Sequence, residues 1–420
     1  GCCHPPYDAM KSAVQSNSAN ERAESTRARL APVVLQVLPS LETGGGGVER
    51  ATIDIAAAIT ANGAPAYVAS SGGHMVSDLD RNGVKHITLP LASKNPLVMR
   101  RNVRRLVDVI DRHGVNIVHA RSRAPAWSAR AAARRTGCSF MTTFHGTYNY
   151  GTSVTGAWKK HYNAVMADGD IVIANSRFIA EHLRTRYDVR EDRVRIVPRG
   201  IDLNIFNPAN TTVARVVDLA GRWNLPDDAS VVMLPGRLTR WKGQSLFIEA
   251  LALLKARLGA ENINVLGLLV GSDQGRAAYR AELEQQIKTL GLAGQVQVLG
   301  HCPDMAAAYM LTDAVVSAST DPEAFGRIVA EAQAMGRPVV VADHGGAAEQ
   351  VIVGETGWLF RPGDATALAE SLADALTIDA NARARLADRA IRHVHHQYSK
   401  TAMCSATLEI YAELRHRRAI

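Results

Sequence analysis

A chain of 420 residues is too long for one hydrophobic core, and its composition, with 47% hydrophobic and 21% charged residues, predicts two globular domains of about 200 residues each. Its five cysteines form no C-x-x-C pair, which argues against a disulfide framework or a zinc site and favours a reducing compartment. No sequence stretch approaches the roughly 18 apolar residues of a membrane span, so we expect a cytoplasmic protein. The net charge of +8 is concentrated in residues 1–200, and a basic half predicts partners that carry phosphate.

The first half of the chain alternates short apolar strands with helical segments. Residues 1–30 are polar and lack an apolar period, so we expect a flexible tail. Apolar strands separated by helices indicate a parallel, doubly wound sheet, and residues 31–198 form the first predicted domain. Its predicted strands are Val33–Leu38, Ala66–Ser70, His86–Leu89, Ile117–Ala120, Phe140–Phe144, Ile171–Ala174 and Val194–Val197. Its clearest helices are Val48–Ala61, Leu97–His113 and Ser176–Arg186.

A second series of strands and helices follows the segment Pro198–Pro208, which reads as an interdomain linker. Residues 199–398 are predicted to form the second domain, and 399–420 a C-terminal helix that returns to the first. The fold class is therefore α/β, with two Rossmann-like, doubly wound parallel sheets facing a cleft. Ligands of such sheets bind beyond the carboxyl ends of the strands. The second set of predicted strands is Val231–Leu234, Val265–Val270, Val296–Leu299, Ala314–Ser317 and Val339–Ala342.

Two glutamates stand eight residues apart in the segment STDPEAFGRIVAEAQAMGRP. Glu323 precedes a helix predicted over Phe325–Met335, and Glu331 lies within it. Eight helical residues span about 12 Å, roughly the reach from the ribose of a nucleotide sugar to its hexose. Carboxylates accept hydrogen bonds from sugar hydroxyls, and the helix N-terminus between them can hold a diphosphate. The structural alternative is that Glu323 only complements the helix dipole while Glu331 faces water.

Two loops after predicted strands have the chemistry of phosphate binding. Gly44–Gly47 opens a helix and can expose backbone N–H groups to an anion, with Gly46 and Gly47 as the candidate contacts. It matches neither G-x-G-x-x-G nor the Walker A pattern, and it can also be a simple flexible turn. In the second loop, Arg237 and Lys242 stand five residues apart and could neutralise one diphosphate, while Arg240 belongs to this set or faces solvent.

Two further predicted strand ends carry a histidine and a glycine-rich turn. His145 follows a strand and precedes a glycine, which favours a place at the ligand site over a packed structural role. The turn Asp343–Glu349 comes after another strand, and Glu349 is a candidate for holding donor-site residues in place without contacting the donor itself.

A basic helix lies in the first half of the chain. Arg100, Arg101, Arg104 and Arg105 repeat at a spacing of four residues, which predicts one charged side. The two interpretations that remain open are a solvated face and contact with an acceptor or an anionic membrane surface.

These motifs together resemble the retaining glycosyltransferases of family four, which have the GT-B fold. The resemblance covers about residues 32–415, and the segments HGTYNY, RLTRWKGQ and SASTDPEAFGR are most similar to bacterial lipopolysaccharide-core and related cell-envelope enzymes. It implies that Arg237 and Lys242 bind the donor diphosphate and that Glu331 holds the ribose. It also implies that Glu323 faces the donor sugar with the backbone of Phe325 and Gly326, and that His145 lies beside that sugar. Four consecutive glycines exceed the usual two, which leaves the phosphate-contacting glycine open.

The resemblance implies a hexosyltransferase without cofactor or metal. Arg237, Lys242 and the helix dipole would stabilise the leaving phosphate in place of a metal ion. The expected partners are a nucleotide-sugar donor, with GDP-mannose ahead of a UDP-hexose or UDP-N-acetylhexosamine, and a glycan or lipid-linked acceptor. We also expect peripheral contact with the inner face of the plasma membrane.

Three other functions remain open from the sequence. An epimerase or hydrolase of nucleotide sugars would act on the donor alone. A sugar-nucleotide sensor would bind without turnover. A nucleic-acid or anionic-surface binder would use the basic half, but with 5% aromatic residues and no recognition motif we expect no nucleic-acid partner.

Overall fold

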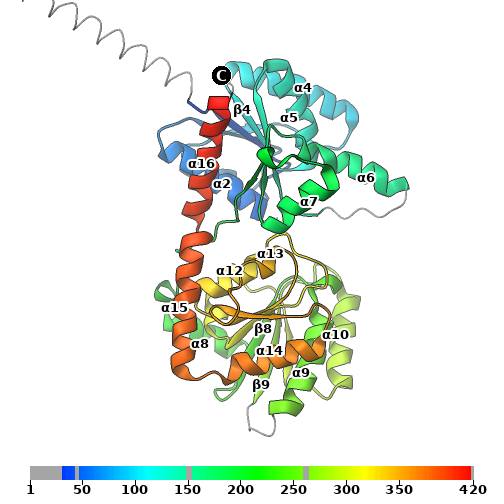
Figure 1. Cartoon of the computed structure of the whole chain (residues 1–420), viewed down its shortest axis with the longest axis vertical. Coiled ribbons are helices and arrows are strands. Elements are labelled where there is room, and N and C mark those ends of the chain that lie inside the picture. Colours follow the sequence, from blue (N-terminus) through cyan, green and yellow to red (C-terminus); the bar gives the residue numbers. More distant parts are fainter. Residues whose placement is uncertain (1–30, 43–46, 148–153, 259–263, 418–420) are drawn as a thin grey trace, which may run out of the picture. The chain divides into compact units, whose positions relative to one another are not determined.

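The computed structural model describes residues 31–42, 47–147, 154–258 and 264–417 (Figure 1). The predicted tail and the glycines at 44–46 lie outside this part of the chain. The chain divides into two compact units, each described by itself below. The first comprises Gly1–Thr143, Tyr150–Val172 and Cys404–Ile420, and the second comprises Phe144–Asn149 and Ile173–Met403.

The N-terminal sheet has seven strands in the order β3-β2-β1-β4-β5-β6-β7, so the order reverses between β1 and β4. The central strand β1 pairs in parallel with β2 and β4 and is buried along its whole length, as expected for an apolar strand covered on both faces. The strands are β1 Val34–Val37, β2 Ala66–Ser70, β3 Lys85–Thr88, β4 Ile117–Ala120, β5 Ser139–Phe144, β6 Ile171–Ala174 and β7 Val194–Ile196. The helices are α2 Gly47–Ala61, α3 Val76–Arg81, α4 Pro96–His113, α5 Arg123–Thr136, α6 Val154–Ala164 and α7 Arg177–Tyr187.

The C-terminal sheet has six strands in the order β10-β9-β8-β11-β12-β13, with its reversal between β8 and β11. The strands are β8 Ser230–Pro235, β9 Val265–Val270, β10 Val296–Leu299, β11 Ala314–Ser317, β12 Val339–Ala342 and β13 Gly357–Phe360. The helices are α8 Val213–Arg222, α9 Gln244–Leu258, α10 Ala277–Thr289, α11 Met305–Met310, α12 Arg327–Ala334, α13 Gly345–Ala348, α14 Ala365–Thr377, α15 Ala380–Gln397 and α16 Lys400–Arg417.

Alternate residues of β8 enter two separate hydrophobic cores. Val232 and Leu234 pack in a cluster with α9 and α14, whereas Val231 and Met233 pack in a cluster with α11 and α12. This two-residue alternation places a core on each face of the sheet, and the layer of helices on both faces confirms the predicted doubly wound α/β class.

Every strand predicted from the sequence is present, with ends shifted by at most one residue. The strand β13 was not predicted, because Gly357–Phe360 begins with a glycine and its apolar run, Trp358–Phe360, is only three residues long. The helix predicted over Phe325–Met335 begins later, at Arg327, because Gly326 adopts a left-handed conformation (φ 80°) that precedes the helix. Glu323 is therefore in a loop, and the helical estimate of 12 Å does not apply to the pair of glutamates.

The predicted linker is paired with another segment of the second unit. The backbone N–H of Ile201 donates to the carbonyl of Tyr398 at 2.7 Å, and that of Lys400 donates to the carbonyl of Ile201 at 3.0 Å. Ile201 is fully buried, so this segment is a packed part of the structure.

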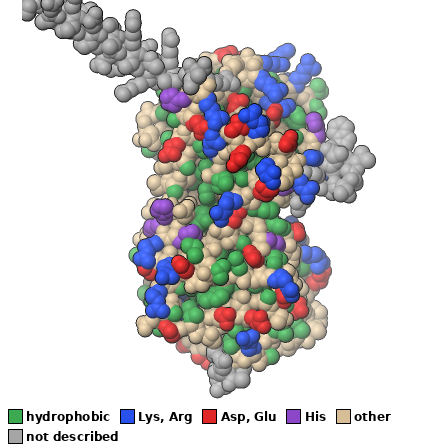
Figure 2. Space-filling view, viewed as in Figure 1, with side chains coloured by type: hydrophobic (Ala, Val, Ile, Leu, Met, Phe, Trp, Pro, Cys, Tyr) green, Lys and Arg blue, Asp and Glu red, His purple; other side chains and the backbone are tan. Residues whose placement is uncertain are grey.

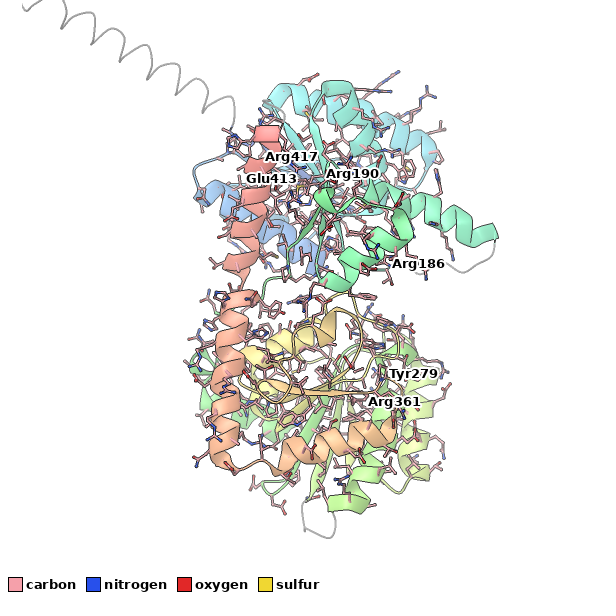
Figure 3. All side chains as sticks on the ribbon, in the orientation of Figure 1. Arg186, Arg190, Tyr279, Arg361, Glu413 and Arg417 are labelled. Carbon is pink, nitrogen blue, oxygen red and sulfur yellow. The ribbon has the colours of Figure 1, made fainter. Side chains whose placement is uncertain are left out.

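The last helix, α16, contributes Tyr411 to the core of the first unit. The Tyr411 hydroxyl lies 2.7 Å from Nδ1 of His119, and Nε2 of His119 lies 2.7 Å from Oγ1 of Thr143. Burial and the neighbouring Arg121 keep the pKa of His119 well below its ordinary value, so the ring is neutral. At the end of the helix, Arg417 and Glu413 form an ion pair of 2.6 Å (Figure 3).

Candidate functional site

The loop after β8 carries the predicted diphosphate-binding residues. Gly236 (φ 141°) lets the chain turn sharply, and Gly243 (φ 78°) packs so closely that a Cβ there would lie 1.9 Å from the carbonyl oxygen of Ala318, beyond β11. The loops after β8 and β11 are thus pressed together at the reversal of strand order, where open α/β sheets bind ligands. Arg237 is exposed, and no described residue forms a hydrogen bond or an ion pair with its guanidinium.

Lys242 and Glu323 meet between these two loops. Nζ of Lys242 lies 2.7 Å from Oε1 of Glu323, and the two side chains are only 14% and 11% exposed. The hydroxyl of Ser319 donates to the same oxygen at 2.5 Å. A largely buried cation and carboxylate are therefore in contact beyond the carboxyl ends of the strands.

A third loop, after β12, fixes the backbone of this site. Nε2 of His344 lies 2.7 Å from the Ser319 carbonyl, which can only accept, so this ring nitrogen carries the proton. The N–H of Gly346 donates to the Glu323 carbonyl at 2.7 Å, and a Cβ on Gly345 would lie 2.7 Å from that same oxygen. The lack of side chains at Gly345 and Gly346 therefore lets the turn after β12 pack directly against the backbone of Glu323.

The segment between the two glutamates is packed and turned by glycine. Phe325 is buried, and a Cβ on Gly326 would lie 2.6 Å from Cβ of Ala347. The side chain of Gln350 donates to the carbonyls of both Phe325 and Gly326. Gly326 offers no side chain to cap α12, and the N–H of Val329 donates to the Gly326 carbonyl at 3.1 Å. The N–H groups of Arg327 and Ile328 at the start of the helix are the ones that could meet an anion.

Glu331 lies on α12 with its carboxylate buried. Its Oε2 accepts a hydrogen bond of 3.0 Å from the Tyr309 hydroxyl, and its Oε1 lies 3.1 Å from Nη2 of Arg327. Burial raises the pKa of Glu331, and the adjacent Arg327 cation and the Tyr309 hydrogen bond oppose that rise. The alternative that Glu331 faces water is wrong.

His145 follows β5 of the N-terminal sheet and is half-buried. Its Nδ1 lies 3.1 Å from Nη2 of Arg199. Because a guanidinium only donates, Nδ1 accepts and the neutral ring carries its proton on Nε2. His145 is thereby prepared as a hydrogen-bond donor.

The other predicted site residues have separate surroundings. Gly46 lies outside the described residues, and Gly47 is the first residue of α2. The Glu349 carboxylate accepts hydrogen bonds from the backbone N–H groups of Arg177 and Phe178. Arg240 turns away from Lys242, since it pairs with Glu282 at 2.8 Å and lies 4.9 Å from the ring centre of Tyr279, which is labelled in Figure 3.

The basic side of α4 is on the surface. Arg100, Arg101, Arg104 and Arg105 are all exposed, and Leu97 at the start of the helix is 66% exposed. Figure 2 shows Lys and Arg side chains gathered over this region of the first unit. The start of the helix is well defined, because the side chain of Asn95 accepts a hydrogen bond from the N–H of Leu97 and Pro96 is the first helical residue.

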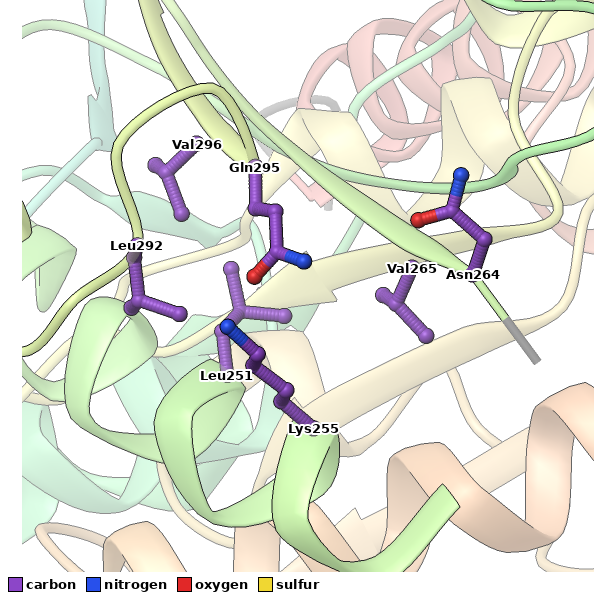
Figure 4. A pocket seen from close by; sticks show the side chains of 7 residues that line it. All are labelled: Leu251, Lys255, Asn264, Val265, Leu292, Gln295 and Val296. Atoms are coloured by element: carbon purple, nitrogen blue, oxygen red, sulfur yellow. The ribbon is translucent and has the colours of Figure 1, made fainter. Parts of the chain in front are cut away.

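A pocket of about 150 Å³ lies at the amino ends of the strands of the C-terminal sheet (Figure 4). Its lining residues include Asn264 and Val265 at the start of β9, and Gln295 and Val296 at the start of β10. It is therefore remote from the loops at the carboxyl ends of the strands.

Within the described ranges, no group of three or more His, Cys, Asp or Glu side chains is placed to hold a metal ion.

None of the described helices combines the length and the apolar character needed to cross a bilayer.

Sequence reasoning gave no role to Ser319, His344, Tyr309 or Arg327. Ser319 stood inside the diagnostic segment, but a serine before an acidic loop has no distinctive pattern. Tyr309 lies 22 residues before Glu331 and meets it only through the fold. The spacing of Arg327 and Glu331, four residues on a helix, was the one available signal.

Two family models match the chain. The model described as Glycosyltransferase Family 4 matches residues 45–205, and the model described as Glycosyl transferases group 1 matches residues 218–393. The first covers β2 to β7 of the N-terminal sheet, and the second covers all six strands of the C-terminal sheet.

A curated relative and two solved structures are similar to the chain. The D-inositol 3-phosphate glycosyltransferase of Stackebrandtia nassauensis is 35% identical over 263 residues, which span 61% of this chain and 57% of that protein. The crystal structure of a glycosyltransferase from Rickettsia africae is 34% identical with a TM-score of 0.81, covering 91% of this chain and 98% of the other. Anabaena Alr3699/HepE in complex with UDP is 25% identical with a TM-score of 0.75, covering 91% and 100%.

Proposed function

Since the chain belongs to the family-four glycosyltransferases of the GT-B fold, we propose that it transfers a hexose from a nucleoside-diphosphate sugar to a hydroxyl of a cell-envelope glycan or lipid-linked acceptor. The observation that carries this proposal is the contact of Lys242 with Glu323 at the carboxyl edge of the C-terminal sheet, next to the uncapped start of α12. In this assignment residues 199–398 bind the donor and residues 31–198 the acceptor, with the helix in 399–420 completing the acceptor domain.

Positive groups around the loops after β8 and β11 support binding of the donor diphosphate. Arg237 is exposed and offers a planar set of donors, Lys242 supplies a second cation, and the first turn of α12 supplies N–H groups. These groups would also stabilise the charge that develops on the departing nucleoside diphosphate. We therefore propose turnover without a divalent metal. Activity that survives EDTA is expected, and activity abolished by EDTA and restored by magnesium or manganese would contradict this.

The reaction we propose retains the configuration at the sugar. The bond from C1 to the diphosphate oxygen breaks, an acceptor hydroxyl oxygen bonds to C1 on the same face, and its proton passes to the leaving phosphate. Glu323 and the backbone of Phe325 and Gly326 would position the donor sugar, with His145 donating a hydrogen bond to it from Nε2. Glu331 would accept hydrogen bonds from the ribose. Gly46 and Gly47 remain proposed contacts of the diphosphate.

The donor and the acceptor are finer proposals. GDP-mannose is the donor predicted from the sequence. The UDP complex of the Anabaena protein supports the alternative, that the donor is a UDP-hexose. The curated relatives are named for inositol 3-phosphate, a polyhydroxylated acceptor with a phosphate. A basic N-terminal half suits an acceptor of that chemistry, whether a phosphorylated glycan or a lipid-linked phosphosugar.

A thermal-shift screen tests the donor assignment. We expect one of GDP, UDP or ADP, or the corresponding sugar nucleotides, to raise the melting temperature, since a ligand at 100 times its Kd stabilises by about 2.7 kcal/mol. Arg237→Ala should lose most of this shift, whereas Arg240→Ala, in the same loop, should keep it. No shift with any nucleotide would refute the donor site.

A turnover assay then distinguishes a transferase from the other nucleotide-sugar enzymes. Product is expected only when donor and acceptor are both present. Efficient release of free sugar, or isomerised donor without acceptor, would favour a hydrolase or an epimerase. Nucleotide binding without any turnover, unaffected by Glu323→Ala, would favour a sensor.

Membrane association rests on α4. We expect co-sedimentation with vesicles of anionic lipid and little with zwitterionic lipid, because each basic residue near such a surface contributes about 1 kcal/mol. Replacing Arg100, Arg101, Arg104 and Arg105 by Gln should abolish it. The control exchanges Arg389 and Arg392 of α15 for Gln, and equal losses in both variants would refute a role for α4.

A further inference from the structure

The Glu331 carboxylate is held from two sides by residues of different helices. Tyr309, fully buried on α11, donates to Oε2 at 3.0 Å. Arg327, the first residue of α12, lies one helical turn before Glu331 and contacts Oε1 at 3.1 Å. Among the residues that the structure describes, each oxygen of this carboxylate therefore has one partner.

The number of acceptor positions that remain matches a vicinal diol. A carboxylate can accept about four hydrogen bonds, two at each oxygen. With one position on each oxygen occupied, one position on each is left open. The two adjacent hydroxyls of a ribose need two adjacent acceptors, whereas a 2′-deoxyribose has only one hydroxyl to offer.

The surroundings of Arg327 distinguish it from an ordinary surface ion pair. Exposed pairs at a spacing of four residues contribute little, because solvent screens them and both side chains lose entropy. Here the carboxylate partner is buried, and Nε of Arg327 is itself buried without a hydrogen-bond partner among the described residues. The guanidinium retains an unused donor beside the carboxylate, at the start of the helix that would face the diphosphate.

We propose that Tyr309 and Arg327 are positioning residues that hold Glu331 for recognition of both ribose hydroxyls, so that the site selects ribonucleoside over 2′-deoxyribonucleoside diphosphates. This inference rests on the proposed role of Glu331 in binding the donor ribose. Arg327 favours the ionised carboxylate, which offers acceptors only, and Tyr309 fixes the rotation of the carboxylate plane. Neither residue needs to touch the reacting atoms.

Isothermal titration of the full chain with UDP, GDP and their 2′-deoxy forms tests this assignment. The wild-type chain is expected to bind UDP or GDP at least about tenfold more tightly than its deoxy form, in line with the loss of one hydrogen bond to a charged group. Tyr309→Phe and Arg327→Gln should each weaken ribonucleotide binding about tenfold and leave the deoxynucleotide within about twofold. The control Arg361→Gln removes an exposed ion pair with Asp364 and should change neither affinity (Figure 3).

A double-mutant comparison separates positioning from general loss of structure. In a Glu331→Gln background, Tyr309→Phe and Arg327→Gln should have no further effect on ribonucleotide affinity. Circular dichroism and the melting temperature show whether the substitution Tyr309→Phe disturbs the fold. If it does, Arg327→Gln, at a more exposed residue, tests the positioning role by itself.

The outcomes assign failure to distinct steps. One outcome refutes only the positioning role. In it, Glu331→Gln loses the preference for ribonucleotides, but Tyr309→Phe and Arg327→Gln either weaken ribo- and deoxynucleotide binding equally or change neither. The ribose role of Glu331 would then stand. If Glu331→Gln keeps both affinity and selectivity, or if the wild-type chain binds neither UDP nor GDP, the proposed donor site fails and the positioning role with it.

Discussion

Glu323→Gln should strengthen the binding of a nucleoside diphosphate while it lowers turnover. In the structure Lys242 is engaged by Glu323 at 2.7 Å, so a diphosphate must compete with that carboxylate for the same ammonium group. Gln keeps the shape and can still accept from Ser319, but it removes the competing charge. Lys242→Met, which removes the ammonium group, should instead weaken diphosphate binding.

The magnitude follows from the geometry of the pair. Two unit charges 2.7 Å apart attract by about 6 kcal/mol at an effective dielectric constant of 20. Desolvation of two side chains that are only 14% and 11% exposed offsets most of this attraction. A residual of about 1.4 kcal/mol corresponds to a tenfold gain in diphosphate affinity for Glu323→Gln. Lys242→Met should cost at least about tenfold, the usual effect of losing one charge-assisted contact.

Isothermal titration with UDP and GDP, combined with initial rates on the sugar nucleotide, measures both effects. Arg240→Gln is the matched control, because this cation of the same loop is already committed to Glu282 and Tyr279 and should leave binding unchanged. Weaker diphosphate binding in Glu323→Gln, or unchanged binding in Lys242→Met, would refute the competition between carboxylate and phosphate.

Three further outcomes follow from the packing and the buried groups. Gly243→Ala should lower the free energy of unfolding, measured by urea denaturation, by about 3 kcal/mol or more, because the added Cβ would meet a carbonyl oxygen at a residue with positive φ. The control Gly221→Ala in α8 places its Cβ in open space and should be neutral or stabilising by up to about 1 kcal/mol. Equal effects of the two substitutions would contradict the close approach of the loops after β8 and β11. Burial raises the pKa of Glu331 above its ordinary 4.5, so nucleotide affinity should fall as the pH is lowered through that raised value. In the same window the folded state binds the proton more tightly than the unfolded chain, so stability should fall as the pH rises from 4.5, and Glu331→Gln should flatten both profiles. Tyr411→Phe leaves Nδ1 of buried His119 without its partner at a cost of about 1–3 kcal/mol, which should appear as faster amide hydrogen exchange in α16; unchanged exchange there would show that this hydrogen bond does not stabilise the helix.

The sequence predicted the strands well because a buried parallel strand needs a continuous apolar run, and such runs are visible residue by residue. It failed at Gly357–Phe360, where a short edge strand is completed by pairing with β12. It also failed at the start of α12, because a glycine before a helix gives no sign of whether it adopts a left-handed conformation. Local patterns therefore located most elements, and tertiary contacts decided their ends.

For the candidate site, loop residues with distinctive chemistry could be found from the sequence, but their partners could not. Lys242 and Glu323 were both candidates, yet they are 81 residues apart, and only the adjacent placement of β8 and β11 brings them together. Tyr309 carries no signal as a partner of Glu331, since a buried tyrosine is ordinary in a core. For Arg240 the sequence left open whether it joins Arg237 and Lys242 or faces solvent, and in the structure it is exposed and paired with Glu282.

The hydrogen bond between Tyr411 and His119 sets an order of events during protein synthesis. The ribosome adds His119 of β4 to the chain 292 residues before it adds Tyr411 of α16. Until residues 404–417 emerge, the first unit lacks the helix that belongs to it, and the polar ring of His119 has no partner at Nδ1. The early unit therefore has to persist in an unfinished state while the second unit is translated, and a fragment truncated after residue 403 would remain unfinished permanently.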